Sequence, residues 1–245
     1  MTFFDSYILC TTPRSGSTFL CGLLRKTGCA GDPQSYFHRP SLADWRDRLH
    51  LAADCNLKSI FDQARHVGTG NSDIFGLRLQ RHSFDFWMTQ LTALHPEQSS
   101  DVGRIEKAFG TTAFIHLTRQ DKIAQAVSLV RAAQSGLWHR NADGSELERL
   151  KPSQGLHYDR AAISREMAEL TVFDHAWRDW FETENITPFN IDYETLAAAP
   201  TDTIRQIFGH LGLDVNQVQN LEPPTAQLAD DINLEWARKF MRETA

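Results

Sequence analysis

The sequence has 245 residues, of which 41% are hydrophobic and 23% are charged, and its formal net charge is -6. This apolar content is enough for one sizeable core, so we expect a single domain over residues 1–245. An acidic chain without a basic stripe argues against a nucleic-acid partner, and it means that any anionic ligand must be held by a local cluster of donors.

The N-terminus, Met1 to Asp5, lacks a basic segment and a long apolar run, so we expect no signal peptide. No window approaches ~18 consecutive apolar residues, so no transmembrane segment is expected. The cysteines and histidines match no usual metal-binding spacing, and the sequence therefore predicts no protein-bound metal. Unpaired thiols in a chain of this length fit a cytoplasmic location.

Short apolar runs alternate with helical patterns along the chain. Strands are predicted over residues 7–10, 73–79, 113–117 and, weakly, 188–191. Helices are predicted from residue 19 to a stop at Gly28, over residues 41–67, 84–94, 122–137 and 160–184, and from an N-cap at Thr201 to residue 211. Residues 139–157 are predicted to form a long loop of the kind that often binds ligands. The alternation predicts an α/β fold, a P-loop-like three-layer sandwich with a central, mainly parallel sheet of about four or five strands flanked by helices.

A turn-rich loop, residues 13–18 (PRSGST), lies between the first strand and the first helix. The unpaired N–H groups of a helix N-terminus attract anions, and Gly16 lets the backbone approach a ligand closely. Ser15, Ser17 and Thr18 add hydroxyl donors, and Arg14 adds a planar cation. A Walker A loop needs a glycine where Thr11 stands and a lysine where Ser17 stands, which argues against an ordinary ATP or GTP phosphotransferase. The loop predicts a site for a phosphate-like anion, with a plain capped turn as the alternative.

This loop resembles the 5′-phosphosulfate loop of sulfotransferases that use 3′-phosphoadenosine 5′-phosphosulfate (PAPS) as the sulfuryl donor. Arg119 at the end of the third predicted strand and Ser128 nine residues later resemble the pair that binds the donor's 3′-phosphate. The resemblance implies that PAPS is bound by Arg14, Ser15, Gly16, Ser17, Thr18, Arg119 and Ser128, and that Arg14 stabilises the leaving phosphate. A surface arginine and an ordinary helix serine are the alternative for Arg119 and Ser128.

Further segments resemble the Stf0-type bacterial sulfotransferases, a trehalose 2-sulfotransferase-like family, along most of the chain. They are residues 27–37 (TGCAGDPQSYF), 76–78 (GLR), 128–138 (SLVRAAQSGLW) and 191–194 (IDYE). The resemblance implies transfer of a sulfuryl group from PAPS to a hydroxyl of a carbohydrate or glycolipid acceptor, without a metal, by a homodimer.

The chain departs from that family pattern at three places. Ser35 stands where the family has the acid thought to be its catalytic base, Arg78 replaces a lysine, and residues 225–227 lack an arginine. We expect His38 to take over as the base and Asp32 to orient the acceptor, because both lie three positions from Ser35. The alternatives are that Asp32 caps a turn and that His38 is solvated.

Two other functions remain open: a P-loop-type phosphotransferase, and a catalytically impaired nucleotide-binding protein, which the loss of the acid at Ser35 favours. His139 and His157 flank the predicted loop and can face substrate or solvent, and Trp138 can stack on a sugar or adenine or belong to the core.

Overall fold

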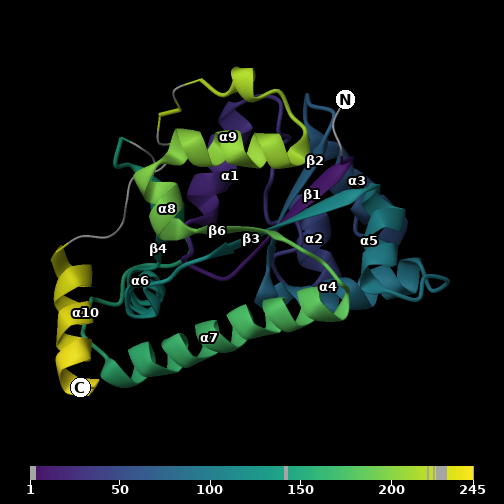
Figure 1. The fold of residues 1–245 in the computed structure, drawn as a ribbon. Coiled ribbons are helices and arrows are strands. Elements are labelled where there is room, and N and C mark those ends of the chain that lie inside the picture. Colours follow the sequence, from purple (N-terminus) through teal and green to yellow (C-terminus); the bar gives the residue numbers. More distant parts are fainter. Residues whose placement is uncertain (1–3, 141–142, 220, 223, 225–230, 245) are drawn as a thin grey trace.

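Four parallel strands form the central sheet of the computed structural model, in the order β2-β1-β3-β6 (Figure 1). They are β1 (Ser6–Thr11), β2 (Phe75–Gln80), β3 (Thr112–Thr118) and β6 (Phe189–Asp192). The structure describes residues 4–140, 143–219, 221–222, 224 and 231–244. In the register, Ser6 pairs with both Phe75 and Thr112, so the carboxyl ends of β2, β1 and β3 lie at the same end of the sheet.

Helices cover both faces of this sheet (Figure 1), and every residue of β1 is therefore buried. Tyr7 and Leu9 pack with α1 and α9 on one face, whereas Ile8 and Cys10 pack with α3, α4, α5 and α7 on the other. The helices are α1 (Ser17–Lys26), α2 (Leu42–Arg48), α3 (Leu57–Thr69), α4 (Arg81–Leu94), α5 (Asp101–Phe109), α6 (Lys122–Ser135), α7 (Arg160–Thr183), α8 (Tyr193–Ala198), α9 (Pro200–Leu211) and α10 (Asp231–Thr244), with a 3-10 turn at Val215–Gln217. The predicted α/β sandwich with a parallel sheet is therefore confirmed.

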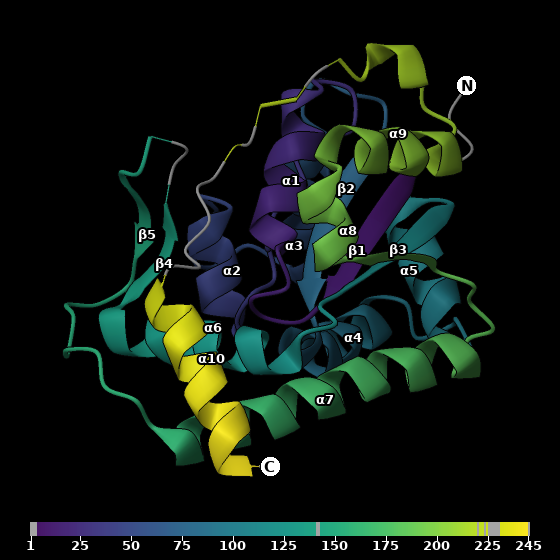
Figure 2. The ribbon, with the colours of Figure 1, turned by 60° about the vertical axis from the view of Figure 1, so that its left-hand side comes forward.

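The helices α6, α7 and α10 enclose a smaller apolar cluster beside the sheet, and Figure 2 shows α10 lying across α6 and the start of α7. The short strands β4 (Leu137–Arg140) and β5 (Glu146–Arg149) pair antiparallel next to them. The prediction of one long loop over residues 139–157 is wrong in this part. The pairing escaped the sequence pattern because the β5 side chains are all exposed, so no apolar alternation marks that strand.

Two helix predictions also need correction. Residues 41–67 form two helices, α2 and α3, which begin after Ser41 and Asn56, and each of these side chains accepts a hydrogen bond from the first turn of its helix. Thr201 is not an N-cap, because α9 already begins at Pro200 and the Thr201 hydroxyl instead accepts a hydrogen bond from the N–H of Leu221 at 3.3 Å. Within the described part of the chain, no helix is both long and apolar enough to cross a membrane.

Candidate functional site

A pocket of about 970 Å³ opens at the carboxyl ends of the parallel strands. Each strand or the loop after it supplies lining residues: the loop 13–18 follows β1, Gln80 ends β2, Arg119 follows β3 and Tyr193 follows β6. The chain continues from β1 to β2 on one side and from β2 to β3 on the other, so the pocket lies where the order of the strands reverses. Ligands of open α/β sheets bind at such switch points.

Gly16 is the N-cap of α1 and brings the backbone of the anion-binding loop close to the ring of Tyr193. Its φ is +84°, and a Cβ at this position would overlap that ring, with Cε2 at 3.0 Å. Ser17 and Thr18 follow in the first turn of α1 and line the pocket. Ser15 is fully buried, and its hydroxyl lies 2.6 Å from that of Thr11, so this hydroxyl holds the loop and does not face the pocket.

Buried polar side chains support the loop from behind. The Asp174 carboxylate is 2% exposed, forms an ion pair with Lys122 and accepts a hydrogen bond from Thr12 Oγ1 at 3.3 Å. Gln125 Nε2 donates to the carbonyl oxygen of Pro13 at 2.7 Å. Because these groups fix the backbone before a ligand arrives, the N–H groups of the loop are preorganised for an anion.

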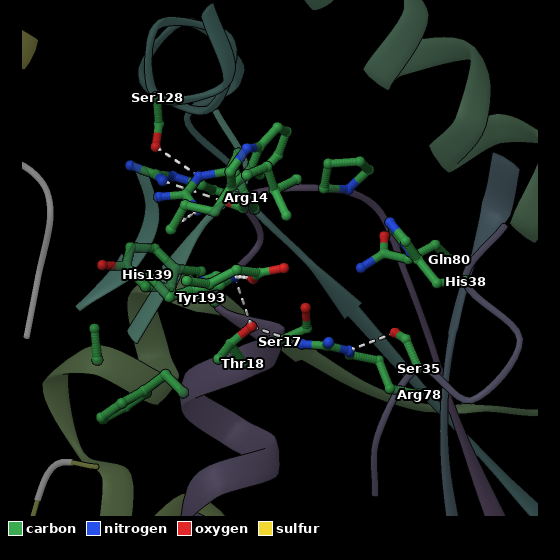
Figure 3. Close-up of a pocket in the computed structure, with 18 of the residues that line it drawn as sticks. Arg14, Ser17, Thr18, Ser35, His38, Arg78, Gln80, Ser128, His139 and Tyr193 are labelled. Atoms are coloured by element: carbon green, nitrogen blue, oxygen red, sulfur yellow. Dashed lines mark hydrogen bonds and ion pairs between the residues drawn. The ribbon is translucent and has the colours of Figure 1, made fainter. Parts of the chain in front are cut away.

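Arg14, Arg119 and Ser128 meet at one end of the pocket (Figure 3 shows Arg14 reaching Ser128). Arg14 Nε donates to Ser128 Oγ at 3.0 Å, and Arg14 Nη1 donates to the carbonyl oxygen of Trp138 at 2.6 Å. The guanidinium of Arg119 lies over the Tyr193 ring, 4.6 Å from its centroid, and its buried Nε has no hydrogen-bond partner. Burial, and then the neighbouring Arg119, lower the pKa of Arg14 to about 10, so it stays charged at neutral pH. Two neighbouring arginines that both line the pocket form a site for a multivalent anion.

Arg78 spans the middle of the pocket. Its Nε donates to Ser35 Oγ at 2.8 Å, and its Nη1 donates to Thr18 Oγ1 at 2.6 Å (Figure 3). His139 Nε2 lies 3.1 Å from Thr18 Oγ1 and 3.5 Å from a carboxylate oxygen of Glu148. Burial, followed by Arg14 and Arg78, lowers the pKa of His139 to about 3, so its ring is neutral at pH 7 despite the nearby carboxylate.

Apart from Arg48, which forms an ion pair with Asp44, the opposite end of the pocket is lined by neutral polar groups, and Figure 3 shows Ser35, His38 and Gln80 on this side. The His38 ring meets that of His82 edge to face, with centroids 5.1 Å apart. Burial, and then His82 and nearby arginines, lower the pKa of His38 to about 4, which keeps the ring neutral. His38 Nδ1 and Gln80 Oε1 are buried without a hydrogen-bond partner.

Asp32 is not among the residues that line the pocket. Its carboxylate forms an ion pair with Arg25 and accepts a hydrogen bond from Gln34 Nε2 at 2.8 Å. Ser35 and His38, which follow the backbone bridge between Gln34 and Leu77, line the pocket, whereas Asp32, which precedes it, does not. The structure therefore does not bring together the predicted pair of Asp32 and His38.

The segment 128–138 positions the walls of the pocket. Gln134 exchanges two hydrogen bonds with the backbone of His157, at 3.0 and 3.1 Å, which holds His157 at the surface outside the pocket lining. Arg131 donates to Asn233 of α10, which also lines the pocket. Residues 225–227, where the sequence lacks an arginine, lie outside the described residues.

Sequence reasoning missed Gln80, His82, Tyr193 and Glu148 as lining residues. The ends of the predicted strands at residues 79 and 191 are a signal that points to Gln80 and Tyr193. Glu148 lies on the unpredicted strand β5, so no signal marks it. Among the described residues, no group of three or more His, Cys, Asp or Glu side chains could hold a metal ion.

The chain matches one family model and several known proteins. The family model described as Stf0 sulphotransferase matches residues 6–243. Trehalose 2-sulfotransferase of Mycolicibacterium smegmatis is 27% identical over 262 residues, which cover 97% of this chain and 95% of that protein. Trehalose 2-sulfotransferase of Mycobacterium tuberculosis is 28% identical over 261 residues, which cover 97% of this chain and 94% of that protein. A solved sulfotransferase from Alicyclobacillus acidocaldarius is 14% identical, with a TM-score of 0.47. The match covers 97% of this chain and 91% of that chain.

Proposed function

The chain belongs to the Stf0 sulphotransferase family, and from that membership and its pocket we propose that it transfers the sulfuryl group of PAPS to a hydroxyl of a carbohydrate or glycolipid acceptor. The observation that carries the proposal is the row of anion-binding groups along the pocket: the N-terminus of α1 in the middle, and Arg119 with Ser128 at one end. This row fits a donor with a 5′-phosphosulfate and a 3′-phosphate.

The neutral end of the pocket, beyond Ser35, is proposed to receive the acceptor. His38 and Gln80 line this end, and an imidazole and an amide can exchange hydrogen bonds with the hydroxyl groups of a sugar. The names of the two mycobacterial relatives make trehalose the first acceptor to test.

The proposed reaction is an in-line displacement at sulfur. The acceptor hydroxyl oxygen forms a bond to sulfur while the bond from sulfur to the oxygen of the 5′-phosphate breaks, and the electron pair of that bond stays on adenosine 3′,5′-bisphosphate (PAP). The hydroxyl proton passes to His38, which lines the pocket and whose ring is neutral at pH 7. The enzyme contributes orientation and fixed positive charge, and sulfate carries less charge than phosphate, so the reaction has less need of a bridging metal ion.

A binding experiment tests the donor, with PAP and AMP compared by calorimetry on the wild type and on Arg119→Ala. PAP should bind more tightly than AMP, because it alone has a phosphate for Arg119 and Ser128. Loss of one charge-assisted contact costs about 1.5–3 kcal/mol, or roughly ten- to a hundredfold in affinity, and should fall on PAP alone. The exposed Arg65 on α3 provides the matched control, because Arg65→Ala removes the same charge outside the pocket.

Equal affinities of the wild type for PAP and AMP would refute the donor assignment. A transfer assay with labelled PAPS, first on trehalose and then on glycolipid extracts, tests the acceptor. Tight binding of PAP without transfer to any acceptor would instead support the alternative of a catalytically impaired nucleotide-binding protein.

A further inference from the structure

Positive charge gathers at the end of the pocket that is proposed to receive the acceptor. Arg48 lines this end together with His38, and Arg39 directly follows His38 in the chain. Burial and His82 lower the pKa of His38 most, and the charges of Arg48, Arg78 and Arg39 lower it further. These guanidinium groups therefore lie close enough for their charge to act at the place where the acceptor is proposed to bind.

Asp44 on α2 is shared between two of these arginines. Its carboxylate oxygens lie 3.5 Å from Arg39 Nη1 and 3.3 Å from Arg48 Nε. Asp44 and Arg48 are four residues apart on the same helix, which ends at Arg48, so the pair holds the guanidinium at the edge of the pocket. Because a single negative charge faces two positive charges, this group of three keeps a net positive charge.

A second cavity, of about 330 Å³, adjoins the pocket at the same place. Ser35 and Arg48 line both spaces, so Arg48 stands at the boundary between them. Further polar side chains line the second cavity, among them Gln34, His50 and Gln63. A substituent on a sugar that occupies the acceptor end can therefore extend past Arg48 into a polar space.

From this arrangement we propose that the acceptor is an anionic saccharide, and that Arg48, with Arg39 beside it, binds the carboxylate or phosphate group of that sugar. The inference rests on the proposed function and names the class of acceptor. A planar guanidinium can donate two hydrogen bonds to either kind of group. A negatively charged acceptor must also approach a negatively charged donor, and cations at the acceptor end offset that repulsion, whereas a neutral sugar has no need of them.

The anionic group takes no part in the bond changes. A hydroxyl oxygen elsewhere on the same sugar forms the bond to sulfur, the bond from sulfur to the 5′-phosphate oxygen breaks, and PAP leaves with the electron pair. The hydroxyl proton passes to His38, as in the proposed reaction. Arg48 thus contributes to the choice and orientation of the acceptor.

Two matched pairs of sugars measure the preference: trehalose with trehalose 6-phosphate, and methyl glucoside with methyl glucuronide. The first pair differs by a phosphate and the second by a carboxylate, so the two pairs distinguish the kinds of anionic group. The Kd values are measured by calorimetry with saturating PAP, which occupies the phosphate sites of the donor. For at least one pair, the neutral sugar should have a Kd about ten times that of its anionic partner, or more.

Variants on α2 show whether Arg48 causes this preference. Arg48→Gln should lower the ratio of the two Kd values about three- to tenfold, because its partly exposed charge is screened by water. Asp44→Asn removes the competing carboxylate and should raise the ratio by a similar factor. Arg205→Gln is the matched control, because Arg205 pairs with Asp202 within one turn of α9, outside both cavities, and it should leave the ratio unchanged. Added salt should reduce the ratio of the wild type.

The outcomes separate this inference from the proposed function. If PAP does not bind, the proposed function fails and the inference fails with it. If PAP binds but the wild type binds both members of each pair equally, or neither member, the donor assignment stands and the anionic class is refuted. A preference for the anionic sugar that Arg48→Gln leaves unchanged also refutes the inference, because Arg48 then serves only as the helix partner of Asp44.

Discussion

The contact between Gly16 and Tyr193 gives a prediction whose size follows from the structure. Gly16→Ala forces a residue with a side chain into a φ of +84°, and its Cβ would overlap the ring of Tyr193. The backbone conformation costs about 1–2 kcal/mol, and forcing an extra methyl group into a filled space costs about 1–3 kcal/mol. The free energy of unfolding should therefore fall by about 2–5 kcal/mol, as measured by urea denaturation.

Gly28 provides a matched control close to the same helix. Its φ is +73°, but a Cβ there would meet nothing within 4 Å, so Gly28→Ala should cost only the backbone part, about 1–2 kcal/mol. Gly16→Ala should also weaken PAP binding, because a displaced Tyr193 no longer lies under the guanidinium of Arg119.

A double-mutant cycle isolates the contact. In a Tyr193→Ala background, Gly16→Ala should cost no more than Gly28→Ala, because the ring that it would overlap is gone. The reasoning is refuted if Gly16→Ala and Gly28→Ala cost the same in the wild type, or if removal of the Tyr193 ring leaves the cost of Gly16→Ala unchanged.

The remaining predictions concern the proton, the metal and the response to acid. His38→Ala should lower the turnover rate by about a hundredfold while the Kd for PAP stays unchanged. Asp32→Asn should leave both the turnover rate and the Kd near the wild-type values, because the Asp32 carboxylate pairs with Arg25 outside the pocket. Steady-state kinetics and calorimetry measure these two quantities, and near-normal turnover of His38→Ala would show that His38 is not the base. Because the pKa of His38 is lowered to about 4, the rate should decline with falling pH only as pH approaches this value, and an acid limb centred near ~6.5 would contradict the lowered pKa. Activity should survive excess EDTA, and a loss that Mg²⁺ restores would favour the phosphotransferase alternative. His139 has a pKa of about 3 in the folded protein but ~6.5 in the unfolded chain, so only the unfolded chain takes up this proton as the pH falls below ~6.5. The free energy of unfolding should therefore decrease from pH ~6.5 down to about pH 3. His139→Gln should make this decrease smaller in denaturation curves measured across the same pH range.

The parts of the site that could be predicted from the sequence are those set by local pattern and sheet topology. A strand, a turn with Gly16 and a helix specify an anion-binding loop, and parallel strands bring Arg119 to the same edge of the sheet as that loop. The orientation of Arg14 could not be predicted in this way. Its partner Ser128 lies 114 residues away, and only the packing of α6 against the sheet decides that the two side chains meet.

Spacing along the chain was misleading where the backbone turns sharply. Asp32 and His38 lie equally far from Ser35 in sequence, and this spacing predicts that both side chains reach the acceptor site. Gly31 has a φ of +70°, and a Cβ there would overlap the carbonyl oxygens of Gly68 and Ile74, so the chain is pressed against α3 and the start of β2 before it reaches the pocket. That constraint directs Asp32 to Arg25, and it depends on long-range contacts that a helical spacing rule ignores.

The two departures from the family pattern at Ser35 and Arg78 belong together. The bridge between Gln34 and Leu77 is parallel, so the next residue on each side, Ser35 and Arg78, are neighbours on one face although they are 43 residues apart in sequence. An acid at position 35 would pair with the cation at position 78 and neutralise it, whereas the serine hydroxyl orients the guanidinium and leaves its charge in place. A change at position 35 therefore alters the charge available at position 78, so these two departures from the family pattern act on the same part of the pocket.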